Sequence, residues 1–171
     1  MSEFHEAGSA GLARGARLGV DVGKARVGLA ASDPDGLVAT PVETVARVLD
    51  ATGVDSSDVR RIADEARERF AAVVYVGLPR HLSGAEGAAT ADARAFATRL
   101  ALAVAPVPVR MVDERMSTVT ATSQLRAAGR KAKSHRKVID QAAAVIILQS
   151  ALDLERTAGT RAGELVETPP T

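Results

Sequence analysis

The 171-residue chain contains no cysteine, very few aromatic residues and almost no net charge. Without cysteine, disulfide bonds, thiolate metal sites and a cysteine nucleophile are excluded. Because aromatic residues make up only 2% of the chain, any buried core must consist mainly of small aliphatic side chains. The 22 basic and 21 acidic residues nearly cancel, so the overall charge indicates no class of partner.

Long hydrophobic runs are also absent. An apolar run such as residues 142–148 is far shorter than the roughly 20 residues that a membrane-spanning helix needs, and the N-terminus lacks the apolar segment of a signal peptide. Hydrophobic residues nevertheless make up 46% of the chain, which is enough for a buried core. The sequence therefore predicts a soluble cytoplasmic protein with no membrane partner: a flexible leader at 1–15, one domain at 16–156 and a disordered tail at 157–171.

Strand-like and helical segments alternate along this domain. Strands are predicted at 17–22, 26–32, 37–45 (with a break at Pro41), 72–76 and 107–112, and helices at 57–70, 85–104, 117–128 and 138–156. The first two strands should form a hairpin around Gly23, whereas the later strands are joined through helices and should be parallel. The predicted fold class is α/β, a mixed five-stranded sheet with helices on both faces. In such sheets, active sites lie at the carboxyl ends of the strands.

Acidic residues occur at three positions where the neighbours are apolar. Asp21 lies inside the first strand, and Asp113 and Glu114 follow the last strand directly. Asp140 lies in the second turn of the last helix, which is strongly apolar. A carboxylate that is buried without a partner costs several kcal/mol. Each of the three positions therefore needs an explanation.

Every one of these acids also has a purely structural explanation. Asp21 could be a turn residue, the strand end could hold an Asp113–Arg115 ion pair, and Asp140 could be favoured by the helix dipole. Carboxylates that converge from separate elements repel one another unless a cation binds them or one takes up a proton. Oxygen ligands without cysteine favour Mg²⁺ or Mn²⁺, and a site of two such ions suits phosphodiester hydrolysis.

Positive charge is concentrated just before the last acid. Residues 126–137 carry six arginine or lysine side chains and no acid, which is typical either of a solvated loop or of a segment that binds a phosphate backbone. The loop at 77–84 could also meet a phosphate. With so few aromatic side chains, recognition by base stacking is not expected. The candidate nucleic-acid contacts are Lys24, Arg26, Arg115, Arg130, Lys131, Lys133, Arg136 and Lys137.

Four segments of the chain carry a resemblance to a known family. They are LGVDVGKARVGLAASD (18–33), VVYVGLPRHLSGAEG (73–87), VRMVDERMST (109–118) and KVIDQAAAVIILQS (137–150). In this order they resemble the YqgF (RuvX) family of RNase H-like proteins, which is related to RuvC-type Holliday junction resolvases. The resemblance covers about residues 16–155.

This resemblance implies an RNase H-like fold with catalytic acids on the first strand, at the end of the fourth and on the final helix. In this chain they are Asp21, one of Asp113 and Glu114, and Asp140. Glu114 is favoured for the middle position because related nucleases generally have a glutamate there, although the sequence alone does not separate the pair. Asp21, Glu114 and Asp140 are accordingly the expected ligands of Mg²⁺ or Mn²⁺.

The implied activity is metal-dependent cleavage of structured nucleic acid, in 5′-end processing of the 16S rRNA precursor. A Holliday junction resolvase acting on branched DNA is an alternative with the same chemistry, and a homodimer would favour it. A non-catalytic RNA-binding factor in ribosome assembly is an alternative from another class. The start of the domain also suggests an actin-like phosphotransferase, but the chain is too short for the two domains that such an enzyme needs.

Overall fold

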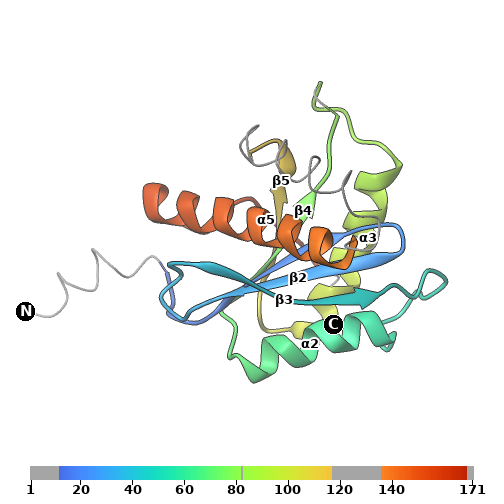
Figure 1. Ribbon diagram of the computed structural model, residues 1–171, viewed down its shortest axis with the longest axis horizontal. Helices are drawn as coiled ribbons and strands as arrows, with labels where there is room; N and C mark the ends of the chain where they lie inside the picture. The colour runs from blue at the N-terminus through green and yellow to red at the C-terminus, as the bar shows by residue number, and fades with distance from the viewer. Residues whose placement is uncertain (1–11, 82, 117–135, 169–171) are drawn as a thin grey trace, which may run out of the picture.

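The computed structural model describes residues 12–81, 83–116 and 136–168, and its centre is a mixed six-stranded sheet (Figure 1). The strands are β1 (Arg17–Val22), β2 (Arg26–Ser32), β3 (Ala39–Ala46), β4 (Val73–Leu78), β5 (Val109–Asp113) and β6 (Glu164–Leu165), in the order β3-β2-β1-β4-β5-β6. The helices are α2 (Ser57–Glu68), α3 (Ala88–Val104) and α5 (Arg136–Ala158), with a short 3-10 helix η1 (Glu114–Met116) directly after β5. The predicted α/β class with a mixed sheet is confirmed.

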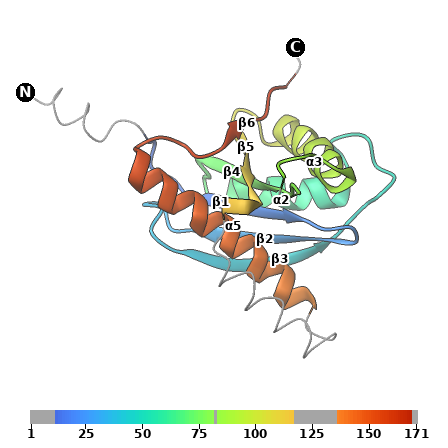
Figure 2. The ribbon, with the colours of Figure 1, turned by 90° about the horizontal axis from the view of Figure 1, so that it is seen from above.

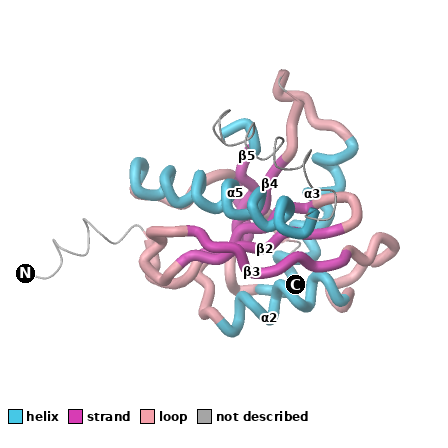
Figure 3. The backbone as a smooth tube through the Cα atoms, in the orientation of Figure 1, coloured by secondary structure: helices cyan, strands magenta, loops and turns pink. Residues whose placement is uncertain are grey.

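The sheet is covered on both faces. Helix α5 crosses one face, whereas α2 and α3 pack side by side on the other (Figure 2). Strands β1, β2 and β3 are antiparallel neighbours, and β1, β4 and β5 are parallel, as the hairpin and the helical connections predict. Figure 3 shows how the strands form the central layer between the helices. The carboxyl ends of the three parallel strands therefore lie together at the same end of the sheet.

Alternate strand residues belong to two separate apolar clusters. The cluster on the side of α2 and α3 includes Leu18, Val20, Val74, Val76, Met111, Ile62, Phe96 and Leu100. The cluster on the side of α5 includes Val73, Tyr75, Val112, Ala144, Leu148 and Leu152. This alternation follows from the two-residue period of a strand, and it assigns a face to each neighbouring polar residue.

Helix α5 packs directly on the backbone of β1. A Cβ atom at Gly19 would lie 2.6 Å from the Leu148 Cβ and 2.8 Å from the Ala144 carbonyl oxygen. Neither atom can move without shifting the helix, so this position requires a glycine. The close contact fixes the height of α5 above the sheet.

The C-terminal segment differs from the predicted disordered tail. Helix α5 continues to Ala158, and β6 pairs antiparallel with β5, which makes six strands instead of five. The Arg110 guanidinium donates hydrogen bonds to the Ala162 carbonyl at 2.6 Å and to the Gly163 carbonyl at 2.8 Å. A strand of two residues has no detectable period, and tertiary contacts of this kind are what hold the segment in place.

Within the described residues, the other helix and strand boundaries agree closely with those predicted from the sequence. Pro41 lies inside β3, near a shift in its register with β2 between Leu29 and Ala30. The helix predicted at 117–128 and most of the predicted leader lie outside the described residues. Among the helices that are described, none has the length and apolar character required to cross a membrane.

Candidate active site

The parallel pairing of the sheet brings two acid-bearing chain segments to the same edge. Val20 of β1 lies opposite Val76 of β4, and Gly77 of β4 lies opposite Val112 of β5. The next residue of β1 is Asp21, and Glu114 lies two residues beyond Val112. Both acids are therefore at the carboxyl ends of parallel strands, where α/β folds generally place their active sites.

Glu114 lies beneath helix α5. A Cβ atom at Gly77 would be 2.8 Å from the Glu114 Oε1 and 2.6 Å from the Ile147 Cδ1 of α5, so the carboxylate occupies space that a glycine leaves open. Burial, and to a smaller extent the negative charge of Asp113, raise the pKa of Glu114 above its ordinary value. Both causes destabilise the ionised carboxylate, and a bound cation would oppose them.

Asp21 lies on the same face of the sheet as Glu114. Strand residues two apart share a face, and Gly19 is the residue of β1 that contacts Leu148 of α5. The side chain of Asp21 is partly buried, and its strand partner is Gly28 of β2. The structure thus brings together two of the predicted catalytic acids under one helix.

The first described side chain of α5 reaches the same part of the sheet. Gly28 lies opposite Thr44 of β3, and the Gln141 Nε2 donates a hydrogen bond of 3.1 Å to the Thr44 Oγ1. Asp21, Gly28 and Thr44 thus form a row across three strands, and Gln141 lies at its end. Asp140 precedes Gln141 on α5, and its side chain lies outside the described residues.

Asp113 is in a different environment from Glu114. It follows Val112 by one residue and therefore points to the opposite face of the sheet. The Arg115 guanidinium donates to both of its carboxylate oxygens, at 2.6 Å for the shortest contact, and the Arg80 Nη1 lies 3.8 Å away. The hydrogen bonds from Arg115 are the largest cause of a lowered pKa of Asp113. The ion pair that the sequence offered as a structural explanation is present, for Asp113 alone.

The hairpin turn after Asp21 is held by an arginine that the sequence analysis did not identify. Within the turn, the Gly23 amide donates to the Arg26 carbonyl at 2.9 Å, and Lys24 is exposed. The Arg47 Nη1 donates to the Gly23 carbonyl at 3.0 Å, and the same guanidinium pairs with Asp92 at 2.6 Å. The side chain of Arg47 is only 3% exposed. Arg47 is the only polar residue in the segment VARVL (45–49), a local signal that the sequence analysis did not use.

The remaining predicted contacts lie mostly outside the described part. Arg130, Lys131 and Lys133 are outside the described residues, and Arg136 and Lys137 form the start of α5 with side chains that are not described. Of the predicted basic residues, the structure places Lys24, Arg26 and Arg115 around the carboxyl ends of β1 and β5.

A buried carboxylate lies at the opposite end of α5, and the sequence analysis missed it. Glu155 is 3% exposed and accepts hydrogen bonds from Arg17 at 3.1 Å, from Arg161 at 3.0 Å and from the Tyr75 hydroxyl. Burial and Glu155 together raise the pKa of Tyr75. A tyrosine in the middle of a fully apolar strand was the one available signal, because a buried hydroxyl needs a partner.

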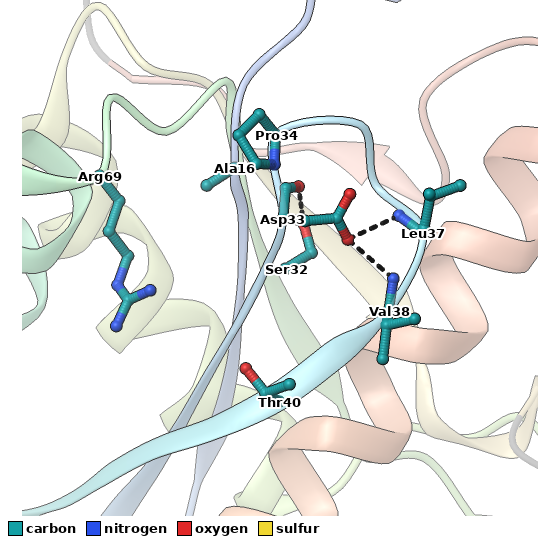
Figure 4. Close-up of a pocket in the computed structure, with 8 residues that line it drawn as sticks. All are labelled: Ala16, Ser32, Asp33, Pro34, Leu37, Val38, Thr40 and Arg69. Atoms are coloured by element: carbon teal, nitrogen blue, oxygen red, sulfur yellow. Dashed lines mark hydrogen bonds between the residues drawn. The ribbon is translucent and has the colours of Figure 1, made fainter.

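The pocket of about 710 Å³ shown in Figure 4 also lies at that opposite end. It is lined by Ala16, Ser32, Asp33, Pro34, Leu37, Val38, Thr40 and Arg69. The Asp33 carboxylate accepts hydrogen bonds of 2.9 Å from the amides of Leu37 and Val38 and so closes the loop between β2 and β3. The hydrogen bonds from these backbone amides lower the pKa of Asp33. None of the predicted catalytic acids lines this pocket.

The sequence motifs and this geometry agree with one known family. A family model described as "RuvX: Holliday junction resolvase" matches residues 15–154 of the chain. The chain belongs to the RuvX family.

Individual RuvX relatives and a solved structure support the same placement. The chain is 54% identical over 158 residues to a Streptomyces avermitilis protein named "Putative pre-16S rRNA nuclease", covering 92% of this chain and 97% of that one. It is 59% identical over 152 residues to a Clavibacter michiganensis protein of the same name, covering 89% and 91%. The structure of T. thermophilus RuvC in complex with a Holliday junction substrate matches with a TM-score of 0.53 at 16% identity, over 85% of this chain and 98% of that one. This likeness confirms the RNase H-like fold.

The described residues of this RuvX chain supply part of a binding site for a hard divalent cation. Asp21 and Glu114 supply oxygen ligands on one face of the sheet, and the raised pKa of Glu114 is what a carboxylate poised for a cation would show. Among the side chains that are described, no three His, Cys, Asp or Glu residues gather closely enough to hold a metal ion. The third expected ligand, Asp140, lies outside them.

Proposed function

We propose that this RuvX protein is a metal-dependent nuclease that hydrolyses phosphodiester bonds in structured nucleic acid. Asp21, Glu114 and Asp140 are its catalytic acids, and the 16S rRNA precursor in the cytoplasm is its substrate. The observation that carries the proposal is the position of Glu114, which lies beneath α5 on the face shared with Asp21 and has a raised pKa. The names of the curated relatives support the choice of substrate.

The chain's own residues divide the work of such a reaction. Asp21, Glu114 and Asp140 would hold Mg²⁺ or Mn²⁺, which supplies an activated water and neutralises charge at the phosphate. Arg47 fixes the turn that follows Asp21, and the contact between α5 and Gly19 fixes the distance between helix and sheet. Because these supports are buried and rigid, the acids are held ready before the substrate binds.

Basic side chains around the site would bind the substrate backbone. Lys24, Arg26 and Arg115 lie near the ends of β1 and β5, and the segment 126–137 adds six positive charges. Contacts of this kind position nucleic acid without reading its sequence. A structured substrate would then be selected by shape.

Resolution of Holliday junctions is the second candidate activity. It is favoured by the description of the matching family model and by the junction bound to the RuvC structure. The same acids would serve both reactions. Two symmetric cuts require two active sites around a two-fold substrate, so this activity would need a homodimer.

A cleavage panel separates these possibilities. Purified protein with Mg²⁺ or Mn²⁺ is mixed with a 16S rRNA precursor fragment carrying its 5′ extension, a four-way DNA junction and unstructured RNA of equal length. We expect cleavage of the precursor fragment, loss of cleavage in Glu114→Gln, and a much smaller loss in the matched variant Asp113→Asn. Preferential cutting of the junction would favour the resolvase. Failure of the wild type to cut any substrate would favour a non-catalytic assembly factor.

A further inference from the structure

The loop between β4 and α3 carries an arginine that is only partly satisfied. Arg80 follows the end of β4, and its side chain is 26% exposed. Its Nη2 donates to the Glu86 Oε2 at 3.2 Å, and its Nη1 lies 3.8 Å from the Asp113 Oδ2, which is beyond hydrogen-bond distance. The Nε is buried, and within the described residues no acceptor lies in reach of it.

Arg115 approaches the same place from the end of β5. Its Nε and Nη2 are held by Asp113, and its Nη1 lies 3.4 Å from the position of a Cβ at Gly84. Gly84 has a φ of +89°, so a side chain is disfavoured there and the guanidinium can lie against the loop. Asp113 therefore stands between two guanidinium groups on the side of the sheet that faces α3.

This arrangement has the chemistry of a phosphate-binding site. Within the described residues, the Nη1 groups of Arg80 and Arg115 donate no hydrogen bond, so each guanidinium keeps a donor for an incoming anion. Hydrogen bonds from charged guanidinium groups to phosphate oxygens are short and strong, and two guanidinium groups held near each other can both donate to one phosphate. Glu86 accepts hydrogen bonds from both Arg80 and Arg94. It therefore competes only weakly with an incoming anion for the Arg80 guanidinium.

We infer that Arg80 and Arg115 together bind a backbone phosphate of the nucleic acid beside the bond that is cut, and that Asp113 positions both guanidiniums. This rests on the proposed nuclease function. Asp113 and Glu114 point to opposite faces of the sheet, so the phosphate bound by the arginines is a neighbour of the reacting phosphate and a different group from it. Asp113, one of the two candidates for the middle acid, is accordingly a positioning residue.

The first test measures binding without cleavage. An RNA hairpin is titrated with Arg80→Gln in the absence of divalent ions, at several salt concentrations. Loss of one phosphate contact should weaken binding about tenfold, because hydrogen bonds to charged groups are strong. It should also reduce the slope of log affinity against log salt by about 0.7–0.9. Arg67→Gln is the matched control, because Arg67 pairs with Asp64 on the exposed side of α2.

Two further variants distinguish a contact from a structural role. Arg80→Lys keeps the charge but not the fork, so it should restore the salt slope and only part of the affinity. Arg115→Gln should show the same losses as Arg80→Gln. Melting temperatures of all variants should stay close to that of the wild type, because the side chains of Arg80 and Arg115 are partly exposed and ion pairs of this kind contribute little to stability.

Cleavage kinetics show whether Arg80 contacts the reacting phosphate or a neighbouring one. Arg80→Gln should raise KM for a cleaved substrate and leave kcat within about twofold, as expected for binding that is equal in ground and transition states. A fall in kcat at unchanged KM would overturn the inference, because Arg80 would then act on the reacting phosphate. Affinity and salt slope equal to those of Arg67→Gln would overturn it as well. A wild type that binds RNA but cuts nothing would contradict the proposed function and leave the binding result to stand by itself.

Discussion

Helix α5 covers a carboxylate at each end of the sheet, and the two have different neighbours. Glu155 is paired with Arg17 and Arg161 and accepts a hydrogen bond from Tyr75. Glu114 is half-buried, and its desolvation and the negative charge of Asp113 raise its pKa. Arginine partners stabilise the charge of a buried carboxylate, whereas burial and a neighbouring negative charge destabilise it, and a bound cation or a proton opposes these two effects. The comparison favours a structural role for Glu155 and supports the catalytic role proposed for Glu114.

The largest expected effect comes from removing the paired carboxylate. Glu155→Gln leaves the buried Arg17 without its charge partner and should lower the free energy of unfolding by about 3 kcal/mol or more. Chemical denaturation of the metal-free protein measures this value. The same substitution at Glu114 is the control, and it should leave the stability unchanged or higher. Equal losses in the two variants would contradict the distinction between the two ends.

The cleavage rate should depend on Glu114 and not on Glu155, the reverse of the pattern expected for stability. Asp21→Asn, Glu114→Gln and Asp140→Asn should each reduce the cleavage rate by about 100-fold or more, because each removes a charged metal ligand. Glu155→Gln, assayed well below its melting temperature, should retain the rate of the wild type.

Asp113→Asn is the matched control for the middle position, and its rate should stay within about tenfold of the wild type. A severe loss in Asp113→Asn with a mild one in Glu114→Gln would exchange the roles of the two acids.

The sequence predicted most of the elements of this site but not their surroundings. Strand alternation indicates that Asp113 and Glu114 point to opposite faces, yet only the packing of α5 over Gly77 shows that Glu114 is the one beneath the helix. The Glu155 network joins residues that are up to 138 positions apart, which no local pattern can reveal. The two-residue strand β6 was missed for the same reason.

Binding of the cation should be visible in thermal stability. An ion at 100 times its Kd stabilises the folded state by about 2.7 kcal/mol, so millimolar Mn²⁺ should raise the melting temperature of the wild type. Mg²⁺ should do so less, because it gives up its water ligands reluctantly. Asp21→Asn and Glu114→Gln should show a much smaller rise. An equal rise in the wild type and both variants would place the ion elsewhere.

The smallest effect concerns pH. Since folding raises the pKa of Glu114 above its ordinary value of 4.5, the stability contributed by its protonated form is present below that pH. It is lost as the pH rises through the raised pKa. Without metal, the wild type should therefore lose stability relative to Glu114→Gln across this window, as measured by denaturation at stepwise pH. A difference that stays constant with pH would contradict the cause assigned to the shift.

Strand β6 has a consequence for how copies of this protein meet in solution. An uncovered edge strand presents a row of N–H and C=O groups that can pair with another chain and lead to aggregation. Here β6 occupies the edge of β5, and Arg94 holds Glu164 of β6 at 2.9 Å. At the other edge, Pro41 interrupts the row of donors on β3. A protein shortened before residue 162 would expose the edge of β5 beside the proposed catalytic acids, and we expect it to aggregate more readily than the full chain.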